Sequence, residues 1–263
     1  MNFTNKIFLL ISIFILIGEN VFGQGKILQE GEELNYVVYY GFIKLGEVNM
    51  KIVNKKIENN KIIYSSRSLM KSYKGVPFVD LNSIFESEMV YDGKEFYSRR
   101  FKAVEYKENA TVTIEYNFNY DSNYVYVVKD NNGKIERDEK IKFNSNVKFQ
   151  DGLSLFYLAR LNSYSAEKFL IPVFMNEVET SVNYYFSSKP EDVSVSFLDN
   201  DVNCIRCNGV VNFEGIFGLT GEFIGWFSND EARVPFKSQL NVVIGSINLE
   251  LVSYKREGWK IKQ

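Results

Sequence analysis

Two cysteines lie three positions apart and are the side chains best suited to redox chemistry. Cys204-Ile205-Arg206-Cys207 has the spacing of a redox dithiol, but such dithiols normally lie at the start of a helix, and the surrounding residues here predict strand and turn. In an extended chain the two Cα atoms would be roughly 10 Å apart, so a disulfide would require a tight turn. We therefore expect either a structural disulfide between Cys204 and Cys207 or two unlinked thiols, in preference to a thiol oxidoreductase.

The sequence contains no histidine, which narrows the chemistry further. It lacks the usual general base for serine and cysteine nucleophiles and the commonest nitrogen ligand of zinc. Glu86 and Glu88 would share one face of a strand, but neighbouring like charges on a strand are typical of a solvated surface. We therefore expect no catalytic residue, no cofactor and no metal site.

One acidic stretch resembles the opening of a calcium-binding loop. Asp199, Asp201 and Asn203 alternate as the first ligands of such a loop would. Cys204 occupies the position that needs glycine, and Val210 occupies the position that needs a bidentate glutamate. The stretch is therefore interpreted as a polar turn.

The N-terminus has the pattern of an export signal. Lys6 precedes an unbroken apolar run from Ile7 to Ile17, and the small residues Val21 and Gly23 occupy the positions that a signal peptidase recognises. A membrane anchor is the alternative, but the run is about half of the roughly 20 apolar residues that span a bilayer. We expect residues 1–23 to form a signal peptide that is removed after Gly23.

Cleavage there would leave residues 24–263 as a mature chain without a cysteine at its start for a lipid anchor. The expected product is a soluble protein of the periplasm, the outer-membrane surface or the exterior, with no membrane span after the signal is removed. A net charge of −2 and a pI near 5.5 exclude the basic footprint of a nucleic-acid-binding protein.

Composition favours a single β-rich domain. The chain has 22 Phe and 17 Tyr, and such residues favour half-buried strands. The mature length of about 240 residues suits one large all-β domain. With 4 prolines and no Gly/Ser tract, no linker is evident in the sequence.

Alternation of apolar and polar residues identifies the strands. It is clearest from Thr111 to Tyr120, where Val112, Ile114, Tyr116, Phe118 and Tyr120 would share one face. The same period occurs at Val48, Met50 and Ile52; Tyr124, Tyr126 and Val128; Val182, Tyr184 and Phe186; Val193, Val195 and Phe197; and Ile247, Leu249 and Leu251. Polar turns lie between the runs at Asn59-Asn60, Asp92-Gly93, Asp121-Ser122-Asn123, Asn131-Asn132-Gly133 and Asn229-Asp230.

These hairpins predict a mainly β fold, a large curled antiparallel sheet that forms a meander and an open or partial barrel. One segment has helical spacing instead. Asp151 could cap a helix that runs to about Asn162, with Leu153, Tyr157 and Leu161 among the residues of its apolar stripe. We expect this short helix to pack against the concave or open side of the sheet.

Four stretches of the sequence form a recognisable series. They are Gly31 to Glu47, Asp151 to Arg160, Trp226 to Pro235, and Ile244 to Leu251. In this order, and over nearly the whole mature chain, they resemble the bacterial exported family catalogued as domain of unknown function 3108. The resemblance implies a mainly antiparallel sheet and residence in the periplasm or at the outer membrane, and it supplies no catalytic residue.

Two residues of the third stretch admit structural interpretations. Asp230 and Arg233 flank a predicted turn, where an ion pair that fixes the hairpin is expected. Trp226 is assigned to the core, although it could line a ligand cavity, and Phe156 is the second candidate for such a lining.

Three functions remain open. The leading hypothesis is an exported cell-envelope protein without catalysis that binds an apolar or lipid-like ligand in the concavity of its aromatic-rich sheet. The alternative is a structural or interaction module of an envelope complex, in which edge strands or aromatic faces dock a protein partner. An enzyme using Cys204 and Cys207 is the third.

Overall fold

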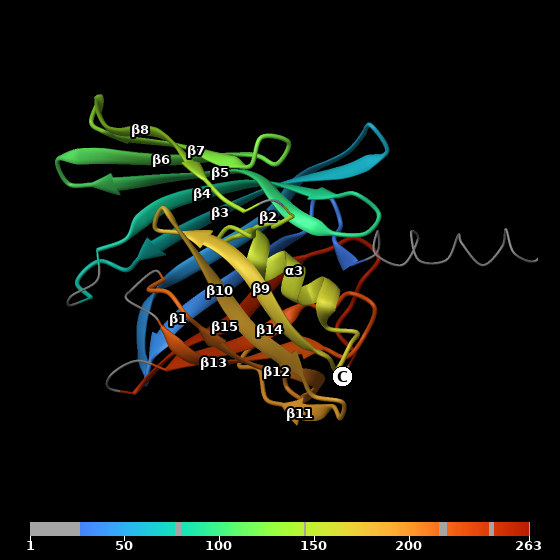
Figure 1. The fold of residues 1–263 in the computed structure, drawn as a ribbon. Coiled ribbons are helices and arrows are strands. Elements are labelled where there is room, and N and C mark those ends of the chain that lie inside the picture. The colour runs from blue at the N-terminus through green and yellow to red at the C-terminus, as the bar shows by residue number, and fades with distance from the viewer. Residues whose placement is uncertain (1–26, 77–79, 145, 216–219, 242–244, 263) are drawn as a thin grey trace, which may run out of the picture.

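The computed structural model describes residues 27–76, 80–144, 146–215, 220–241 and 245–262. The expected signal peptide, residues 1–23, lies outside the described residues. The described part is built around one antiparallel sheet of 15 strands and a helix, α3, that lies within its curve (Figure 1). The predicted fold class, a mainly β curled meander with one short helix, is confirmed, and the sheet does not close into a barrel.

The elements follow one another along the chain in a regular series. They are β1 (Glu33–Tyr40), β2 (Ile43–Glu58), β3 (Lys61–Ser72), β4 (Asn82–Tyr91), β5 (Phe96–Lys107), β6 (Ala110–Asn119), β7 (Tyr124–Asn131), β8 (Lys134–Lys142), α3 (Ser154–Asn162), β9 (Lys168–Met175), β10 (Val178–Phe186), β11 (Glu191–Val193), β12 (Val202–Val211), β13 (Gly221–Ser228), β14 (Pro235–Asn241) and β15 (Ser246–Lys255). The order across the sheet is β8-β7-β6-β5-β4-β3-β2-β1-β15-β14-β13-β12-β10-β9, with β11 beside β12. The first strand therefore lies in the middle of the sheet and pairs with the last.

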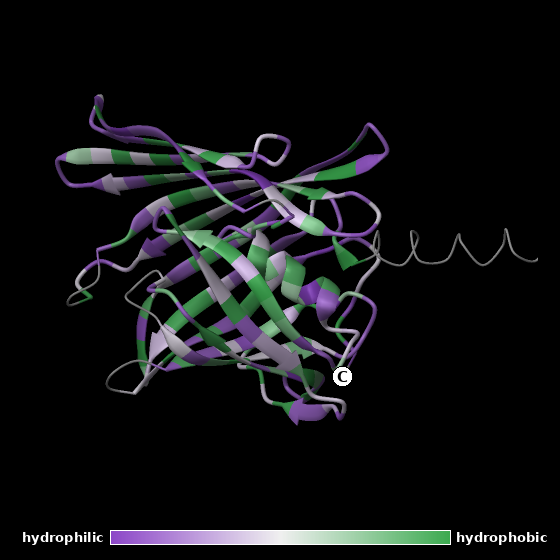
Figure 2. Cartoon of the chain, viewed as in Figure 1, coloured by the Kyte–Doolittle hydropathy of each residue, from purple (hydrophilic) through white to green (hydrophobic). Residues whose placement is uncertain are grey.

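Alternating side chains give the sheet one apolar face, as the striped strands in Figure 2 show. In β6 the predicted buried face is confirmed by Tyr116 and Phe118. The predicted face of β7 is wrong, because Val125 and Val127 are fully buried while Tyr124 and Tyr126 point outward. Val125 and Val127 pair with Phe118 and Tyr116, so the register with β6 decides which face is inside.

The predicted strand through Val193, Val195 and Phe197 is shorter than expected. It ends at Val193, which pairs with Val202 of β12. Because the chain reverses between these two partners, residues 194–201 must form the connection, and Val195 is buried without belonging to a strand. The polar Asp199 and Asp201 lie in this connection, in agreement with the turn interpretation, whereas Asn203 belongs to strand β12.

The polar turns lie where the sequence predicts them. Asn59 and Asn60 both have positive φ, of 50° and 60°, and join β2 to β3. Asparagine tolerates this left-handed conformation better than most residues, which explains its use in a tight hairpin. Asn123 and Asn132 also have positive φ, in the turns after β6 and β7.

Helix α3 begins three residues later than predicted, and Asp151 nevertheless caps it. The Asp151 Oδ1 atom accepts hydrogen bonds from the backbone N–H groups of Leu153 and Ser154, both at 2.8 Å. Leu153 and Tyr157 are buried in the main core, and Phe156 and Leu161 pack against it. Other helix residues, Leu155 and Ala159, contact the second core cluster beneath β9, β10, β12 and β13. The helix thus fills the space between two inward faces of the same sheet.

A short segment from Phe149 to Asp151 bridges parts of the sheet that do not pair with each other directly. The Phe149 carbonyl accepts from the Ser98 N–H of β5, and Gln150 exchanges backbone hydrogen bonds with Pro172 and Phe174 of β9, all at 2.9 Å. The Asp151 Oδ2 atom accepts from the Ser87 and Ser98 hydroxyls, both at 2.6 Å. The segment therefore joins β4 and β5 to β9 and to α3.

A buried ionic cluster ties both ends of the described chain to α3. Glu32 pairs with Arg160 of the helix and with Arg256 near the C-terminus, and all three are almost fully buried. Arg160 also donates to the carbonyls of Ile27 and Ala232, each at 2.9 Å. Two guanidinium groups thus share one buried carboxylate.

Replacement of Glu32 tests the importance of this cluster. Glu32→Gln should lower the free energy of unfolding by about 3–5 kcal/mol, because two buried cations would lose their carboxylate. Urea denaturation followed by circular dichroism would measure the loss. The neighbouring half-exposed Glu33 provides the matched control, since Glu33→Gln should cost less than about 1 kcal/mol. Equal losses in the two variants would show that the buried cluster contributes nothing special.

Candidate functional site

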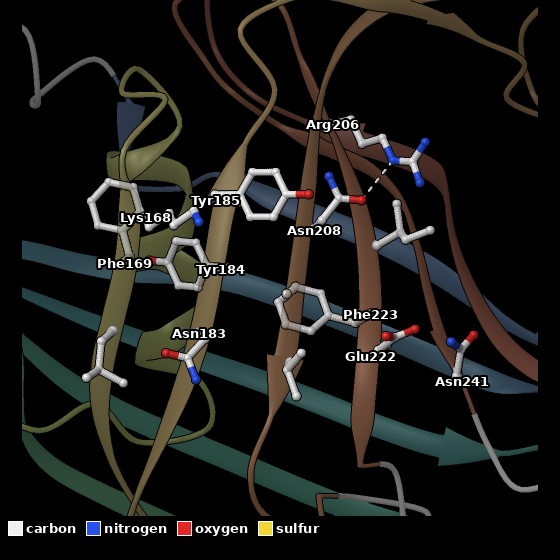
Figure 3. A pocket seen from close by; sticks show the side chains of 14 residues that line it. Lys168, Phe169, Asn183, Tyr184, Tyr185, Arg206, Asn208, Glu222, Phe223 and Asn241 are labelled. Carbon is white, nitrogen blue, oxygen red and sulfur yellow. Dashed lines mark hydrogen bonds between the residues drawn. The ribbon is translucent and has the colours of Figure 1, made fainter.

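A groove of about 490 Å³ crosses the outer face of β9, β10, β12, β13 and β14. Its position follows from strand alternation. Tyr184 and Cys207 are buried in the second core cluster, so Tyr185 and Asn208, one residue further along each strand, face outward. Figure 3 shows Tyr185 lying towards Asn208, with Arg206 further along the same strand, β12. The groove is therefore on the side of the sheet opposite to α3.

Much of the groove surface is apolar. Leu170 of β9 and Tyr185 of β10 leave 67% and 45% of their surface exposed, and Val210 of β12 is also exposed. Phe223 of β13 also borders the groove, but its ring packs against the second core cluster and lies over Gly209, where a Cβ atom would lie 2.4 Å from it. Exposed apolar residues that adjoin one another across strands mark a contact surface more often than isolated ones do.

Two cations flank this apolar surface. Lys168 and Arg206 both line the groove, and neither forms an ion pair with a described carboxylate within 4.0 Å. The Arg206 Nε atom donates to Asn208 Oδ1 at 3.1 Å, and its guanidinium lies 5.9 Å from the centre of the Trp226 ring. One carboxylate, Glu222, also lines the groove. The arrangement suits a ligand with an apolar body and an anionic group.

The sequence-predicted lining residues lie elsewhere. Phe156 is on α3, inside the sheet, where its ring packs edge-on against Tyr36 and Tyr157. Trp226 is half-buried on β13 and its Nε1 atom donates to Glu191. It contacts Arg206 without lining the groove itself. The concavity expected to hold a ligand is occupied by α3 and the aromatic core.

The sequence contains a pattern that could have identified the groove residues. Lys168–Met175 contains the apolar run Phe169-Leu170-Ile171, and Tyr184-Tyr185 places two large rings on opposite faces of one strand. A strand with one solvated face should alternate, so apolar residues on both faces indicate that the outer face also makes contacts.

Both cysteines are free, and they lie in extended strand β12 with no tight turn between them. Cys204 belongs to the main core cluster and Cys207 to the second, on opposite faces of the strand. The structure therefore favours the unlinked alternative over the disulfide. Burial raises the pKa of each thiol to about 12, which suppresses the thiolate that redox chemistry needs.

The predicted ion pair between Asp230 and Arg233 is replaced by a different local arrangement. Asp230 Oδ1 accepts from the Ser228 hydroxyl and from the N–H groups of Ala232 and Arg233, at 2.7, 2.9 and 3.3 Å. Arg233 instead donates to the Ser228 carbonyl and the Asn229 side chain. The carboxylate holds the turn through backbone groups, which leaves the guanidinium free to lie over the Tyr164 ring.

The two neighbouring acids of β4, Glu86 and Glu88, have structural partners. Glu86 pairs with Arg67 and Glu88 pairs with Arg99. These two acids lie on a solvated face of β4, as the sequence predicts. In the described part, no group of three acidic or thiol side chains is arranged to hold a metal ion. None of its helices has both the length and the apolar character needed to cross a bilayer.

A family model described as a protein of unknown function, DUF3108, matches residues 35–252. The chain belongs to this family. The match confirms the resemblance carried by the four sequence stretches and extends it through the strands between them. No curated protein matches the sequence.

This DUF3108 chain is also similar to solved bacterial structures. A β-barrel-like protein of domain of unknown function DUF1849 from Brucella abortus aligns with a TM-score of 0.52 at 8% identity, over 85% of this chain and 96% of that one. A Bacteroides fragilis protein with a YmcC-like fold, described as a candidate exported protein, has a TM-score of 0.38 at 8% identity, over 87% and 97% of the two chains. A candidate lipoprotein from Parabacteroides distasonis gives 0.34 at 8% identity, over 86% and 96%. The first similarity shows the fold alone.

Thiol alkylation tests the buried state of the cysteines in this DUF3108 protein. In native protein at pH 8, iodoacetamide should leave Cys204 and Cys207 unmodified for hours, because each thiol is buried and its pKa is raised to about 12. Intact-mass measurement after dissolution in urea should show both sites alkylated. Rapid modification of the native protein would contradict the buried arrangement, and a mass two hydrogens lower before alkylation would reveal a disulfide.

Proposed function

We propose that this protein is an exported, non-catalytic protein of the cell envelope that binds an amphipathic anion in the outer groove. The ligand class is a long apolar chain with an acidic group, as in a fatty acid or an anionic lipid. The single observation that carries the proposal is an exposed apolar groove bordered by Lys168 and Arg206, neither of which has a described ion-pair partner. The N-terminal signal pattern supports export.

The chemistry of the groove explains this choice of ligand. An acyl chain would remove Leu170, Tyr185 and Val210 from water, which is favourable in proportion to the apolar area covered. An acidic group near Arg206 would accept charge-assisted hydrogen bonds, which are roughly twice as strong as neutral ones. Asn183 and Asn208 add amide groups that can orient the polar end.

The groove contains no evident catalytic arrangement. Its single carboxylate, Glu222, has no second acid beside it among the residues that line the groove. The deeply buried Asp151 and Glu32 are already bonded to several donors inside the protein. We therefore assign a binding function and no reaction.

Docking of a partner through an edge strand has less support. The edge strand β8 is Lys-Ile-Glu-Arg-Asp-Glu-Lys-Ile-Lys, and such charge density opposes strand addition. The other edge, β9, already exchanges hydrogen bonds with Gln150. A protein partner on the outer face remains the second candidate, and in-cell crosslinking would reveal it as a dominant protein adduct.

Binding of a dansyl-labelled fatty acid tests the groove. Tyr185→Asp should weaken binding by about 10-fold or more, because a charge would replace apolar contact area. Tyr106→Asp is the matched control: Tyr106 is 43% exposed, as Tyr185 is at 45%, but lies on β5 outside the groove. Equal weakening in both variants, or no binding by the wild type, would overturn the proposal.

A second variant tests the anionic end separately. Arg206→Gln should weaken the labelled acid by about 10-fold, the scale of one charge-assisted hydrogen bond, and should leave a labelled fatty alcohol unaffected. Fluorescence titration measures both affinities. If Arg206→Gln weakens the binding of the alcohol and of the acid equally, Arg206 shapes the groove and does not recognise the charge of the ligand.

A further inference from the structure

Trp226 contacts both a base and an acid beside the groove. It lies on β13 and pairs directly with Arg206 of β12, whose guanidinium is 5.9 Å from the centre of the indole ring. The indole Nε1–H group donates a hydrogen bond to the carboxylate of Glu191 on β11. The ring face attracts a cation and the N–H group attracts a carboxylate, so one side chain binds two opposite charges at different places.

The strand pairing brings Glu191 close to Arg206. Strands β11 and β13 lie on the two sides of β12, since Cys204 of β12 pairs with Glu191 on one side and with Ser228 on the other. The contact between Glu191 and Trp226 therefore spans β12, about 10 Å from strand to strand, and crosses it within two residues of Arg206. A long acidic side chain at this position has the guanidinium within its reach.

Glu191 and Arg206 nevertheless form no ion pair. Both are described residues, and no hydrogen bond or salt bridge joins their side chains. The Arg206 Nε atom donates to Asn208 instead, as Figure 3 shows, and the Nη1 and Nη2 groups have no acceptor among the described residues. The exposed carboxylate of Glu191 is bonded to the indole. The indole N–H group and the guanidinium thus compete for one carboxylate, and the indole holds it.

We infer that Trp226 keeps Arg206 open to the acidic group of a ligand by holding Glu191 on its N–H group. The inference rests on the proposed function and adds the regulation of the same site. Without the indole N–H group, Glu191 would pair with Arg206 at the point where the acidic group binds, and the ligand would have to displace it. Trp226 does not line the groove, so it is a positioning residue that acts through Glu191 and Arg206.

Removal of the indole N–H group tests the inference. Trp226→Phe keeps an aromatic ring beside Arg206 and removes the hydrogen-bond donor. It should weaken binding of the dansyl-labelled fatty acid by about 5-fold, the upper scale of an exposed ion pair, and leave the labelled fatty alcohol unaffected. Addition of Glu191→Gln to this variant should restore the wild-type affinity for the acid, because no carboxylate remains to compete. Fluorescence titration measures all three affinities.

The matched control is the same substitution at the other tryptophan. Trp259 also donates from its Nε1 atom to a carboxylate, that of Asp230 at 2.8 Å, and it does not line the groove. Trp259→Phe should leave the affinity for the acid unchanged. The inference is overturned if Trp226→Phe binds the acid as the wild type does, or if the double variant binds it as weakly as Trp226→Phe. Unchanged urea midpoints would show that the variants remain folded.

A measurement without ligand separates this inference from the proposed function. Phenylglyoxal modifies accessible arginine side chains, and peptide mass spectrometry would give the rate of modification at Arg206. The rate should fall in Trp226→Phe and return to the wild-type value when Glu191→Gln is added. If the rates follow this pattern but the wild type binds neither the acid nor the alcohol, the proposed ligand is wrong and the control of Arg206 stands. An unchanged rate in Trp226→Phe would overturn the inference even in a protein that binds the acid.

Discussion

The carboxylate of Asp151 joins β4 and β5 to the start of α3, in the one short segment that also reaches β9. It accepts four hydrogen bonds, from the hydroxyls of Ser87 and Ser98 and from the N–H groups that begin α3. The edge strands β8 and β9 do not pair with each other, and the backbone of the adjacent Gln150 binds β9, so residues 150 and 151 together link β4 and β5 to β9. Burial raises the pKa of Asp151 against the opposing effect of its four donors, so the carboxylate is tolerated only while they stay in place.

The fold could be predicted from the sequence where the signal is local. A period of two residues and asparagine-rich turns identify β6, β10 and β15. In a strand with one buried face, apolar and polar residues alternate, so its own sequence shows which face is buried. The inward face of β7 was not recoverable in this way, since valines and tyrosines alternate there and both suit a strand. Its orientation is decided by Tyr116 and Phe118 on the neighbouring strand. The burial of Glu32 could not be predicted either, because a buried carboxylate beside the half-exposed Glu33 has no local signature.

The candidate site is harder to predict than the fold for a related reason. Leu170, Tyr185 and Val210 are ordinary strand residues in sequence, and they adjoin one another only because β9 and β12 both pair with β10. Phe156 and Trp226 are the more conspicuous aromatics, yet the first packs inside and the second lies beside Arg206.

The pairing of β1 with β15 has a consequence for how the protein folds. Tyr36 and Leu251 are neighbours across this pair although their positions in the chain, 36 and 251, differ by 215. A polypeptide made or exported from its N-terminus cannot complete the middle of its sheet until its last strand arrives. Contacts of such long sequence separation slow folding, so the edge of β1 that pairs with β15 stays unpaired until the last strand is delivered. The protein is thus expected to need a chaperone, or rapid late collapse, during the interval before β15 arrives.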